Sequence, residues 1–289
     1  MIVQKVDMPL RGLVRDVYAP LKAISPKTLR LYEFTLDAFS KFLSHEPTTA
    51  DLEELVVARF LAHRTATRAA ATAAKDRAQL HAIWEFLARR KAVQTWPTMP
   101  PVRVPERVPE AWLTEEFARL LAAASSEKTT IAGVPGGLWW RALLLVAYDT
   151  GERATALVSL RWSDVRGNFV TFRAEARKGK RRDIVRDIGE ETRLAIEAIR
   201  GDRDLVFPWP FHHTYLWNRL SIILRRAKLP ASRRDKFHRI RRTTASYYQA
   251  AGHSAQQLLD HSSPATTRKY LDPRVVQNVP APSVIPRVC

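Results

Sequence analysis

The stretch Tyr148-Asp-Thr-Gly-Glu-Arg153 ends the most apolar segment of the chain and precedes a region whose sequence pattern is no longer helical. The segment before it, residues 138–148, is apolar on most faces, which predicts a buried helix. Beyond it lie two short segments rich in β-branched residues, 168–172 and 183–188, with a basic turn around Gly179 between them. These segments predict a small antiparallel hairpin.

Helical patterns dominate the rest of the chain. Ser25 followed by Pro26 predicts a helix start, because serine caps free N–H groups and proline at the first helical position loses no hydrogen bond. The helix that follows has one apolar stripe at steps of three and four residues. Further helices are predicted from Thr48 or Thr49 to Arg90, and at 190–199, 213–227, 240–250 and 254–259. The fold class is therefore mainly α with a small antiparallel β-sheet.

A proline-rich segment divides the chain. Residues 96–110 contain Pro97, Pro100, Pro101, Pro105 and Pro109. Proline forbids continued helix and favours an extended, stiff connector. We therefore predict a helical domain at 1–95, a linker at 96–110 and a second domain at 111–289. The hydrophobic fraction of 46% is enough to build a core in each domain.

The charge balance indicates a polyanionic partner. The 289 residues contain 47 Lys and Arg against 29 Asp and Glu, a formal net charge of +18. Such an excess gives affinity for phosphates without specifying a sequence. The one cysteine, Cys289, excludes an internal disulfide framework and suits a reducing compartment. No apolar run approaches the roughly 20 residues of a membrane helix, so we expect a cytoplasmic, nucleoid-associated protein without a membrane span.

The densest cationic stretch runs from Arg225 to Arg242 and contains one acidic residue, Asp235. Within it, His238-Arg239-Ile240-Arg241 puts a histidine and an arginine three residues apart, on one face of a helix. A proton acceptor beside a phosphate-binding guanidinium needs this spacing. By itself the pattern is weak, because any arginine-rich helix produces it often.

Several short sequence boxes occur together and in a fixed order. They are Tyr148-Asp-Thr-Gly-Glu-Arg153, Leu160-Arg-Trp-Ser-Asp164, His238-Arg239-Ile240-Arg241 and Leu259-Asp-His261-Ser-Ser-Pro-Ala-Thr-Thr-Arg-Lys-Tyr270. In this order and spacing the chain resembles the tyrosine recombinase (phage integrase) family, in which the tyrosine is the ninth residue after the second histidine. The same spacing separates His261 from Tyr270.

The resemblance implies a fold, an activity and a set of partners. The fold is a core-binding domain of the SAM-like type and an α+β catalytic domain, which form a C-shaped clamp on DNA. The activity is site-specific cleavage and rejoining of double-stranded DNA by a homotetramer on two sites, with no metal and no small-molecule cofactor. The residues that the family pattern assigns to catalysis are Arg153, Lys178, His238, Arg241, His261 and Tyr270, with Lys180 as the alternative to Lys178.

The chemistry explains why these residue types occur together. When a phenolate attacks a phosphodiester, negative charge builds on the non-bridging oxygens, and Arg153 and Arg241 are suited to bind them. Tyrosine has a pKa of about 10 and needs a proton acceptor, here His238. The departing 5′ oxygen needs a proton, which Lys178 supplies, while His261 hydrogen-bonds the phosphate. A 3′-phosphotyrosine linkage keeps the bond energy, so rejoining needs no ATP.

Three observations keep alternatives open. Ala156 stands where the family usually has glutamate, so Glu152 is the candidate to orient Arg153 instead. Asp260 stands where the family usually has the glycine that precedes the second histidine. Tyr247 and Tyr248 lie in the helix that carries Arg241, where a packing role is commoner. The alternatives to an active recombinase are a DNA-binding protein that has lost cleavage and a type IB topoisomerase.

Overall fold

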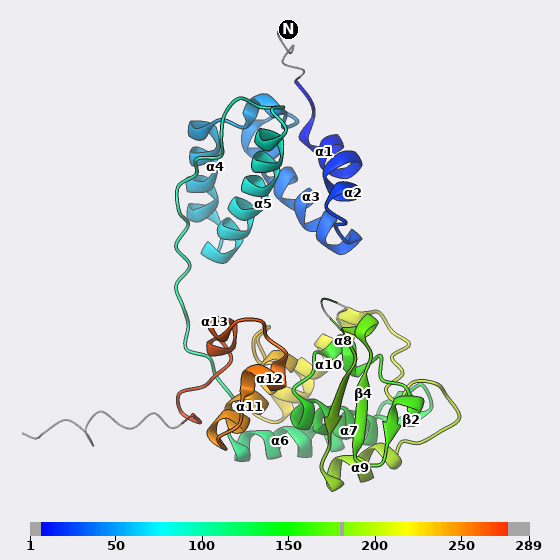
Figure 1. The fold of residues 1–289 in the computed structure, drawn as a ribbon. Coiled ribbons are helices and arrows are strands. Elements are labelled where there is room, and N and C mark those ends of the chain that lie inside the picture. The colour runs from blue at the N-terminus through cyan, green and yellow to red at the C-terminus, as the bar shows by residue number, and fades with distance from the viewer. Residues whose placement is uncertain (1–6, 178, 180–181, 277–289) are drawn as a thin grey trace, which may run out of the picture. The chain divides into compact units, whose positions relative to one another are not determined.

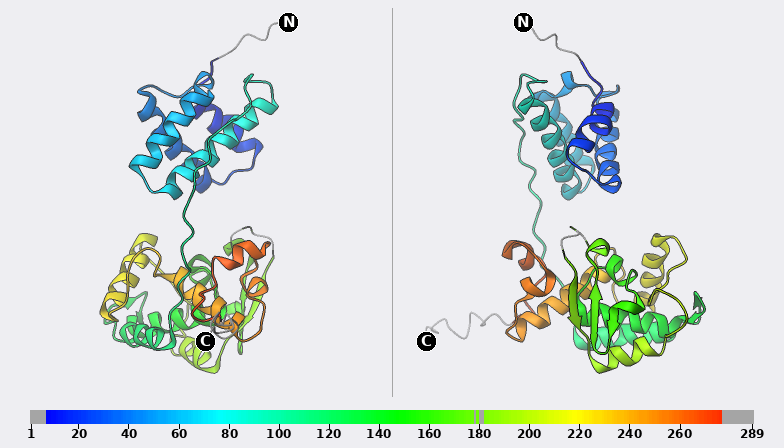
Figure 2. Two further views of the ribbon diagram at one scale, coloured as in Figure 1. Left: turned by 90° about the vertical axis from the view of Figure 1, so that its left-hand side faces the viewer. Right: turned by 45° about the vertical axis from the view of Figure 1, so that its right-hand side comes forward.

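A computed structural model describes residues 7–177, 179 and 182–276, and these form two compact units that divide between Arg107 and Val108 (Figures 1 and 2). The division falls inside the proline-rich segment. Residues 96–113 form neither helix nor strand, as expected of a proline-rich connector. Each unit has its own hydrophobic core.

The first unit is entirely helical. Its main helices are α3 (Pro26–Leu43), α4 (Glu54–Thr67) and α5 (Ala70–Arg89). The predicted start at Ser25 is confirmed, since its side chain accepts a hydrogen bond from the backbone N–H of Thr28. Shorter helical segments, which the sequence analysis did not predict, precede α3: α1 (Leu10–Leu13), the π-helical η1 (Val14–Tyr18) and α2 (Ala19–Leu21).

The region from Thr48 to Arg90 is less regular than the sequence suggested. Thr48 caps only a 3₁₀ turn, η2 (Thr49–Asp51), and α4 begins after it. Arg68 and Ala69 adopt extended conformations, which separates α4 from α5. The core of this unit is formed by aromatic and aliphatic side chains of α3, α4 and α5, among them Leu36, Phe39, Phe60, Leu80, Ile83 and Trp84.

The second unit begins with α6 (Thr114–Ser125), a two-stranded ribbon of β1 (Thr130–Ile131) and β2 (Val134–Pro135), and α7 (Gly136–Thr150). A short α8 (Ala154–Leu157) and the 3₁₀ turn η3 (Trp162–Asp164) lead to β3 (Val165–Arg166), β4 (Phe169–Phe172), the 3₁₀ turn η4 (Ala174–Ala176) and β5 (Ile184–Asp187). The helices α9 (Glu190–Glu197), α10 (His213–Arg226), α11 (Phe237–Ala250), α12 (Ala255–Leu259) and α13 (Pro264–Arg268) complete it.

The predicted hairpin is confirmed and is part of a larger sheet. Strands β4 and β5 pair antiparallel, with Val170 opposite Arg186, and β3 adds a third strand in the order β3-β4-β5. β3 is only two residues long, so its alternation was too short to recognise. Figures 1 and 2 show this sheet on one side of α7 and the helices α11–α13 on the other.

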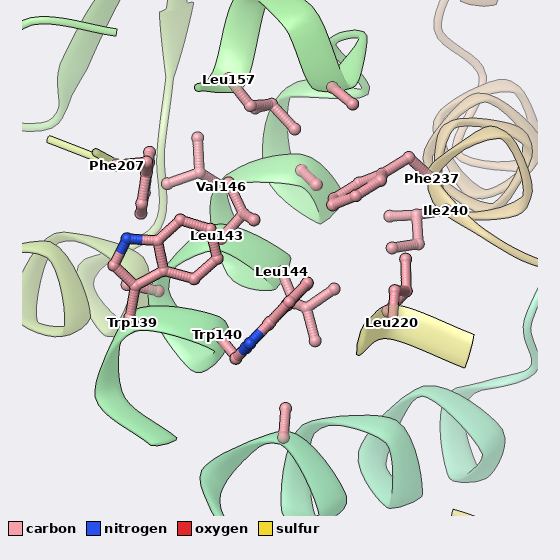
Figure 3. Packing of buried hydrophobic residues seen from close by; sticks show 14 of the residues in the cluster. Trp139, Trp140, Leu143, Leu144, Val146, Leu157, Phe207, Leu220, Phe237 and Ile240 are labelled. Atoms are coloured by element: carbon pink, nitrogen blue, oxygen red, sulfur yellow. The ribbon is translucent and has the colours of Figure 1, made fainter. Parts of the chain in front are cut away.

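Helix α7 forms the centre of the second unit, as its apolar sequence predicted. Around its buried residues pack side chains from the neighbouring elements, including Leu157, Phe207, Leu220, Phe237 and Ile240 (Figure 3). Helix α11 begins at Phe237, earlier than the predicted Ile240, because Phe237 is itself part of this core. His238 and Arg241 therefore lie on one helix, as their spacing suggested.

Candidate active site

Arg241 projects from α11 and is 1% exposed. Its Nη1 donates to the carbonyl oxygen of Gly151 at 2.5 Å, and its Nη2 donates to the carbonyl oxygen of Leu259 at 2.8 Å. The guanidinium therefore joins the loop after α7 to the end of α12. Burial and the positive charge of Arg153 lower the pKa of Arg241 to about 10, so the group is still charged at neutral pH.

Arg153 lies at the start of α8, immediately after a sharp turn. Helix α7 ends at Gly151 with a left-handed φ of +61°, and a Cβ there would contact Thr244 at 3.4 Å and Leu259 at 3.5 Å. Only glycine adopts this conformation without strain. The turn directs the chain back towards α11, and the positive charge of Arg153 acts on Arg241, His238 and His261.

The rings of His261 and Tyr270, two residues that flank α13 in the sequence, contact each other, with centroids 5.0 Å apart. The Nδ1 of His261 lies 3.2 Å from the hydroxyl oxygen of Thr267, and its Nε2 lies 3.5 Å from Nη2 of Arg241. Burial and the charges of Arg241 and Arg153 lower the pKa of His261 to about 4. The imidazole is therefore neutral at physiological pH, and because Arg241 has only donors, Nε2 faces it as an acceptor.

The main chain around Tyr270 is fixed by α11. The hydroxyl of Ser246 donates to the carbonyl oxygen of Tyr270 at 3.2 Å and accepts from the backbone N–H of Asp272 at 2.8 Å. The side chain of Asp272 is fully buried and accepts from the backbone N–H of Ala111 at 2.6 Å. Tyr270 is thus attached both to the helix of Arg241 and to the first residues of its own unit.

His238 lies on the solvent-exposed side of α11. Partial burial of the ring and the charges of Arg241, Arg242 and Arg153 lower its pKa below the usual value. Lys178 and Lys180, the two candidates for the acid, lie outside the described residues. The structure thus brings Arg153, His238, Arg241, His261 and Tyr270 into one neighbourhood.

The other tyrosines that the sequence offered lie elsewhere on α11. The hydroxyl of Tyr247 is 3.3 Å from that of Thr114. Tyr248 is exposed and packs on His253, with ring centroids 4.9 Å apart. The guanidinium carbon of Arg241, by contrast, lies 5.7 Å from the centroid of the Tyr270 ring.

Glu152, Arg177 and Asp260 form an ion cluster beside these residues. Nη2 of Arg177 donates to Oε1 of Glu152 and its Nη1 donates to Oδ2 of Asp260, each at 3.1 Å. Asp260 also accepts from Arg182 at 2.7 Å. Sequence reasoning missed Arg177 because nothing in the order of residues links it to positions 152 and 260.

The two departures from the family pattern have structural counterparts. Ala156 is 1% exposed and lies in the hydrophobic core. Glu152 accepts a hydrogen bond from the Arg177 side chain and another, at 3.4 Å, from the backbone N–H of Arg153. Asp260 has a left-handed φ of +52°, a conformation that suits glycine and that aspartate tolerates better than most residues.

The cationic stretch divides into an exposed and a buried part. Arg239 is buried, with its guanidinium 3.7 Å from the Trp112 ring and hydrogen-bonded to Asp235 at 2.9 Å. It therefore stabilises the fold. The exposed cations, which are available to a partner, are Arg225, Arg226, Lys228, Arg233 and Arg234.

The described part of the chain contains no group of three or more His, Cys, Asp or Glu side chains arranged to hold a metal ion. Among the helices of the same residues, none combines the length and apolar character needed to cross a membrane.

Comparison with known families assigns the second unit, because residues 111–275 match the phage integrase family. The chain belongs to the phage integrase family of tyrosine recombinases. Residues 19–91 match a second model, the phage integrase N-terminal SAM-like domain. This confirms the family and the SAM-like type of the first domain.

One curated relative is tyrosine recombinase XerD of Lacticaseibacillus casei, which is 28% identical to this chain over 156 residues. The alignment spans 53% of this chain and 52% of XerD, about half the length of each.

Solved structures share the fold at low sequence identity. A lambda integrase dimer bound to a COC′ core site matches with a TM-score of 0.71 at 18% identity, covering 94% of this chain and 80% of that one. XerH bound to palindromic difH substrate, in a post-cleavage complex, matches with a TM-score of 0.64 at 18% identity, covering 90% and 80%. The predicted fold class is thereby confirmed.

Proposed function

We propose that this chain is a site-specific DNA recombinase that cleaves and rejoins DNA through a covalent 3′-phosphotyrosine formed by Tyr270. The observation that carries the proposal is the convergence of Arg153, Arg241, His261 and Tyr270, which come from three separate parts of the sequence. Tyrosine beside two permanent positive charges and a neutral imidazole is suited to nucleophilic attack on a phosphodiester.

The first half of the proposed reaction is attack by the Tyr270 oxygen on the phosphorus. The phenolic proton passes to His238, whose lowered pKa keeps it neutral and able to accept. Arg153 and Arg241 bind the non-bridging oxygens, on which negative charge increases in the transition state. His261 donates a hydrogen bond to the same phosphate in the tautomer that carries its proton on Nε2, and Nδ1 then accepts from the hydroxyl of Thr267.

The second half is departure of the 5′ oxygen, which takes a proton from Lys178 or its alternative Lys180. The P–O bond to the 5′ oxygen breaks as the P–O bond to Tyr270 forms, so no bond energy is lost to hydrolysis. Attack by a 5′ hydroxyl of another strand reverses the step and regenerates free Tyr270. Neither ATP nor a metal ion is part of this scheme.

The partner of the proposed function is double-stranded DNA. A net charge of +18 and the exposed cations of the 225–234 region support binding to phosphates. Both units are proposed to bind the DNA. Similar solved structures include a lambda integrase tetramer bound to a Holliday junction, with a TM-score of 0.69, and we propose a homotetramer on two DNA sites.

A nicked suicide substrate tests the proposal, because loss of a short fragment after cleavage traps the covalent intermediate. Wild type should form a covalent protein–DNA adduct, Tyr270→Phe should form none, and the exposed Tyr248→Phe should behave as wild type. An equal adduct in Tyr270→Phe would contradict the assignment. Salt-sensitive DNA binding without any adduct would indicate a protein that has lost cleavage, and relaxation of plasmid without a defined site would indicate a topoisomerase.

DNA captured on Tyr270 in cells gives the recognition site. Sequencing the trapped fragments should return one recurrent sequence if the protein is site-specific. Fragments without a common sequence would contradict site specificity while leaving the cleavage chemistry intact. The same experiment tests the expected cytoplasmic, nucleoid-associated location, because adducts must form on chromosomal DNA or on a mobile element.

A further inference from the structure

Two arginines connect the same pair of loops at consecutive positions. Arg241 hydrogen-bonds the carbonyl oxygens of Gly151 and Leu259. One residue further along each loop, Arg177 hydrogen-bonds the side chains of Glu152 and Asp260. The next residue of each loop belongs to the candidate active site: Arg153 in one and His261 in the other.

The Arg177 side chain is too buried to meet DNA. It is 4% exposed, and that of Glu152 is 1% exposed. A buried ion pair adds little net stability, because desolvation of the two charges offsets their attraction. The two buried charges must nevertheless stay paired, because removing one partner leaves the other charge buried without compensation. Such a pair fixes the relative position of the segments that carry it.

We propose that Arg177 is a positioning residue that, through Glu152 and Asp260, holds Arg153 and His261 at the separation which a shared phosphate requires. The proposal rests on the proposed cleavage function. Arg241 cannot do this alone, because it must also face the phosphate. A shift of about 1 Å in a site of this kind costs on the order of 10²-fold in rate.

Asp260 departs from the family pattern at this position. The family pattern has glycine here, which supplies the left-handed conformation but no charge. Asp260 keeps that conformation, with φ of +52°, and adds a carboxylate between Arg177 and Arg182. The buried Glu152 supplies the second carboxylate, where the family's usual position is occupied by the core residue Ala156.

The test compares single-turnover adduct formation at saturating DNA among matched variants. Asp260→Gly and Asp260→Asn keep the left-handed turn and remove the charge, so both should fold. We expect Arg177→Met and both Asp260 variants to form adduct about 10- to 10²-fold more slowly, with unchanged DNA affinity. Arg177→Lys, which keeps the charge, should recover part of the rate. The exposed pair of Arg161 and Asp204, 2.9 Å apart, provides the control Asp204→Asn, with wild-type rate.

A substrate with sulfur in place of the bridging 5′ oxygen distinguishes a defect in positioning from a defect in protonation of the leaving group. A thiol has a pKa of about 8.5 and leaves without a donated proton. If Arg177 positions Arg153 and His261, its variants stay slow on this substrate. Recovery of the wild-type rate would overturn the proposal, because the defect would then lie in protonation of the leaving group.

Amide hydrogen exchange gives a readout that does not depend on cleavage. Asp260→Gly and Arg177→Met should increase exchange in peptides that cover residues 151–154 and 259–262, and Asp204→Asn should not. Unchanged exchange in both loops would overturn the proposal even if wild type cleaves DNA. If wild type forms no adduct, the proposed function fails; increased exchange would then still support the link between the loops, and unchanged exchange would reject it.

Discussion

The guanidinium carbon of Arg241 lies 5.7 Å from the centroid of the Tyr270 ring, although the two residues belong to different elements. Arg241 is held by carbonyl oxygens of two loops, and Tyr270 is held through Ser246 on the same helix as Arg241. The proposed nucleophile and the proposed phosphate-binding group therefore share one rigid support.

Arg241→Lys should slow adduct formation by about 10²- to 10³-fold. Lysine keeps the charge but has no planar fork, so it cannot hydrogen-bond both loop carbonyls and a phosphate oxygen. Single-turnover trapping on the suicide substrate measures the rate. Arg200→Lys, a change at an exposed residue that pairs with Glu197, serves as the control. Similar rates for the two variants would argue against a role of Arg241 in the chemical step.

Asp272→Asn should lower the free energy of unfolding by about 1–3 kcal/mol. The buried carboxylate accepts from the backbone N–H groups of Ala111 and Arg274 at 2.6 and 2.9 Å, and an amide has only one oxygen to accept with. Urea unfolding gives the change in stability. Adduct formation should also slow, because Asp272 and Ser246 fix the main chain that follows Tyr270. A variant with wild-type stability and rate would show that the hydrogen bonds of the Asp272 carboxylate contribute to neither.

Acidification should destabilise the second unit through His261. Its pKa is lowered to about 4 by burial, Arg241 and Arg153, whereas an unfolded histidine titrates at about 6.5. The folded state therefore resists protonation, and stability that is fully present above about pH 6.5 is lost as the pH falls towards about 4. Paired carboxylates such as Asp260 have lowered pKa values, so their contribution is lost only at still lower pH.

Urea unfolding at several pH values between about 7 and 5 measures this effect. His261→Gln should lose less stability on acidification than wild type, because it has no group to protonate at this position. The exposed His253→Gln should follow wild type. Equal pH dependence of wild type and His261→Gln would contradict the prediction.

Leu143→Ala should lower the free energy of unfolding by about 2–5 kcal/mol, because it removes buried methyl groups from the centre of the core. Leu143 is 0% exposed, whereas Leu138 on the same helix is 43% exposed. Leu138→Ala should therefore change stability by about 0.5 kcal/mol or less. If both substitutions had the same cost in thermal or urea unfolding, α7 would not be the core helix of the second unit.

Much of the fold followed from local patterns. The helix start at Ser25, the buried helix α7 and the β4–β5 hairpin all depend on signals within a few residues, such as capping, apolar periodicity and turn composition. The break at Arg68 and the third strand β3 did not follow, since neither carries a proline or a sufficiently long alternation. The helix start at Phe237 could not be predicted, because charged residues surround Phe237 in the sequence. Only the packing against α7 shows that its side chain is buried.

The sequence by itself determined the family and the identity of the candidate residues. The order of the sequence boxes and the spacing from His261 to Tyr270 identify the candidate residues. The chemistry of phosphoryl transfer explains why these residue types act together. Their supports, Ser246, Asp272 and the ion cluster around Arg177, were decided only by the tertiary structure. The physical reason is that these contacts join segments far apart in the chain, and a buried charge finds its partner through packing, which leaves no periodic signal in the order of residues.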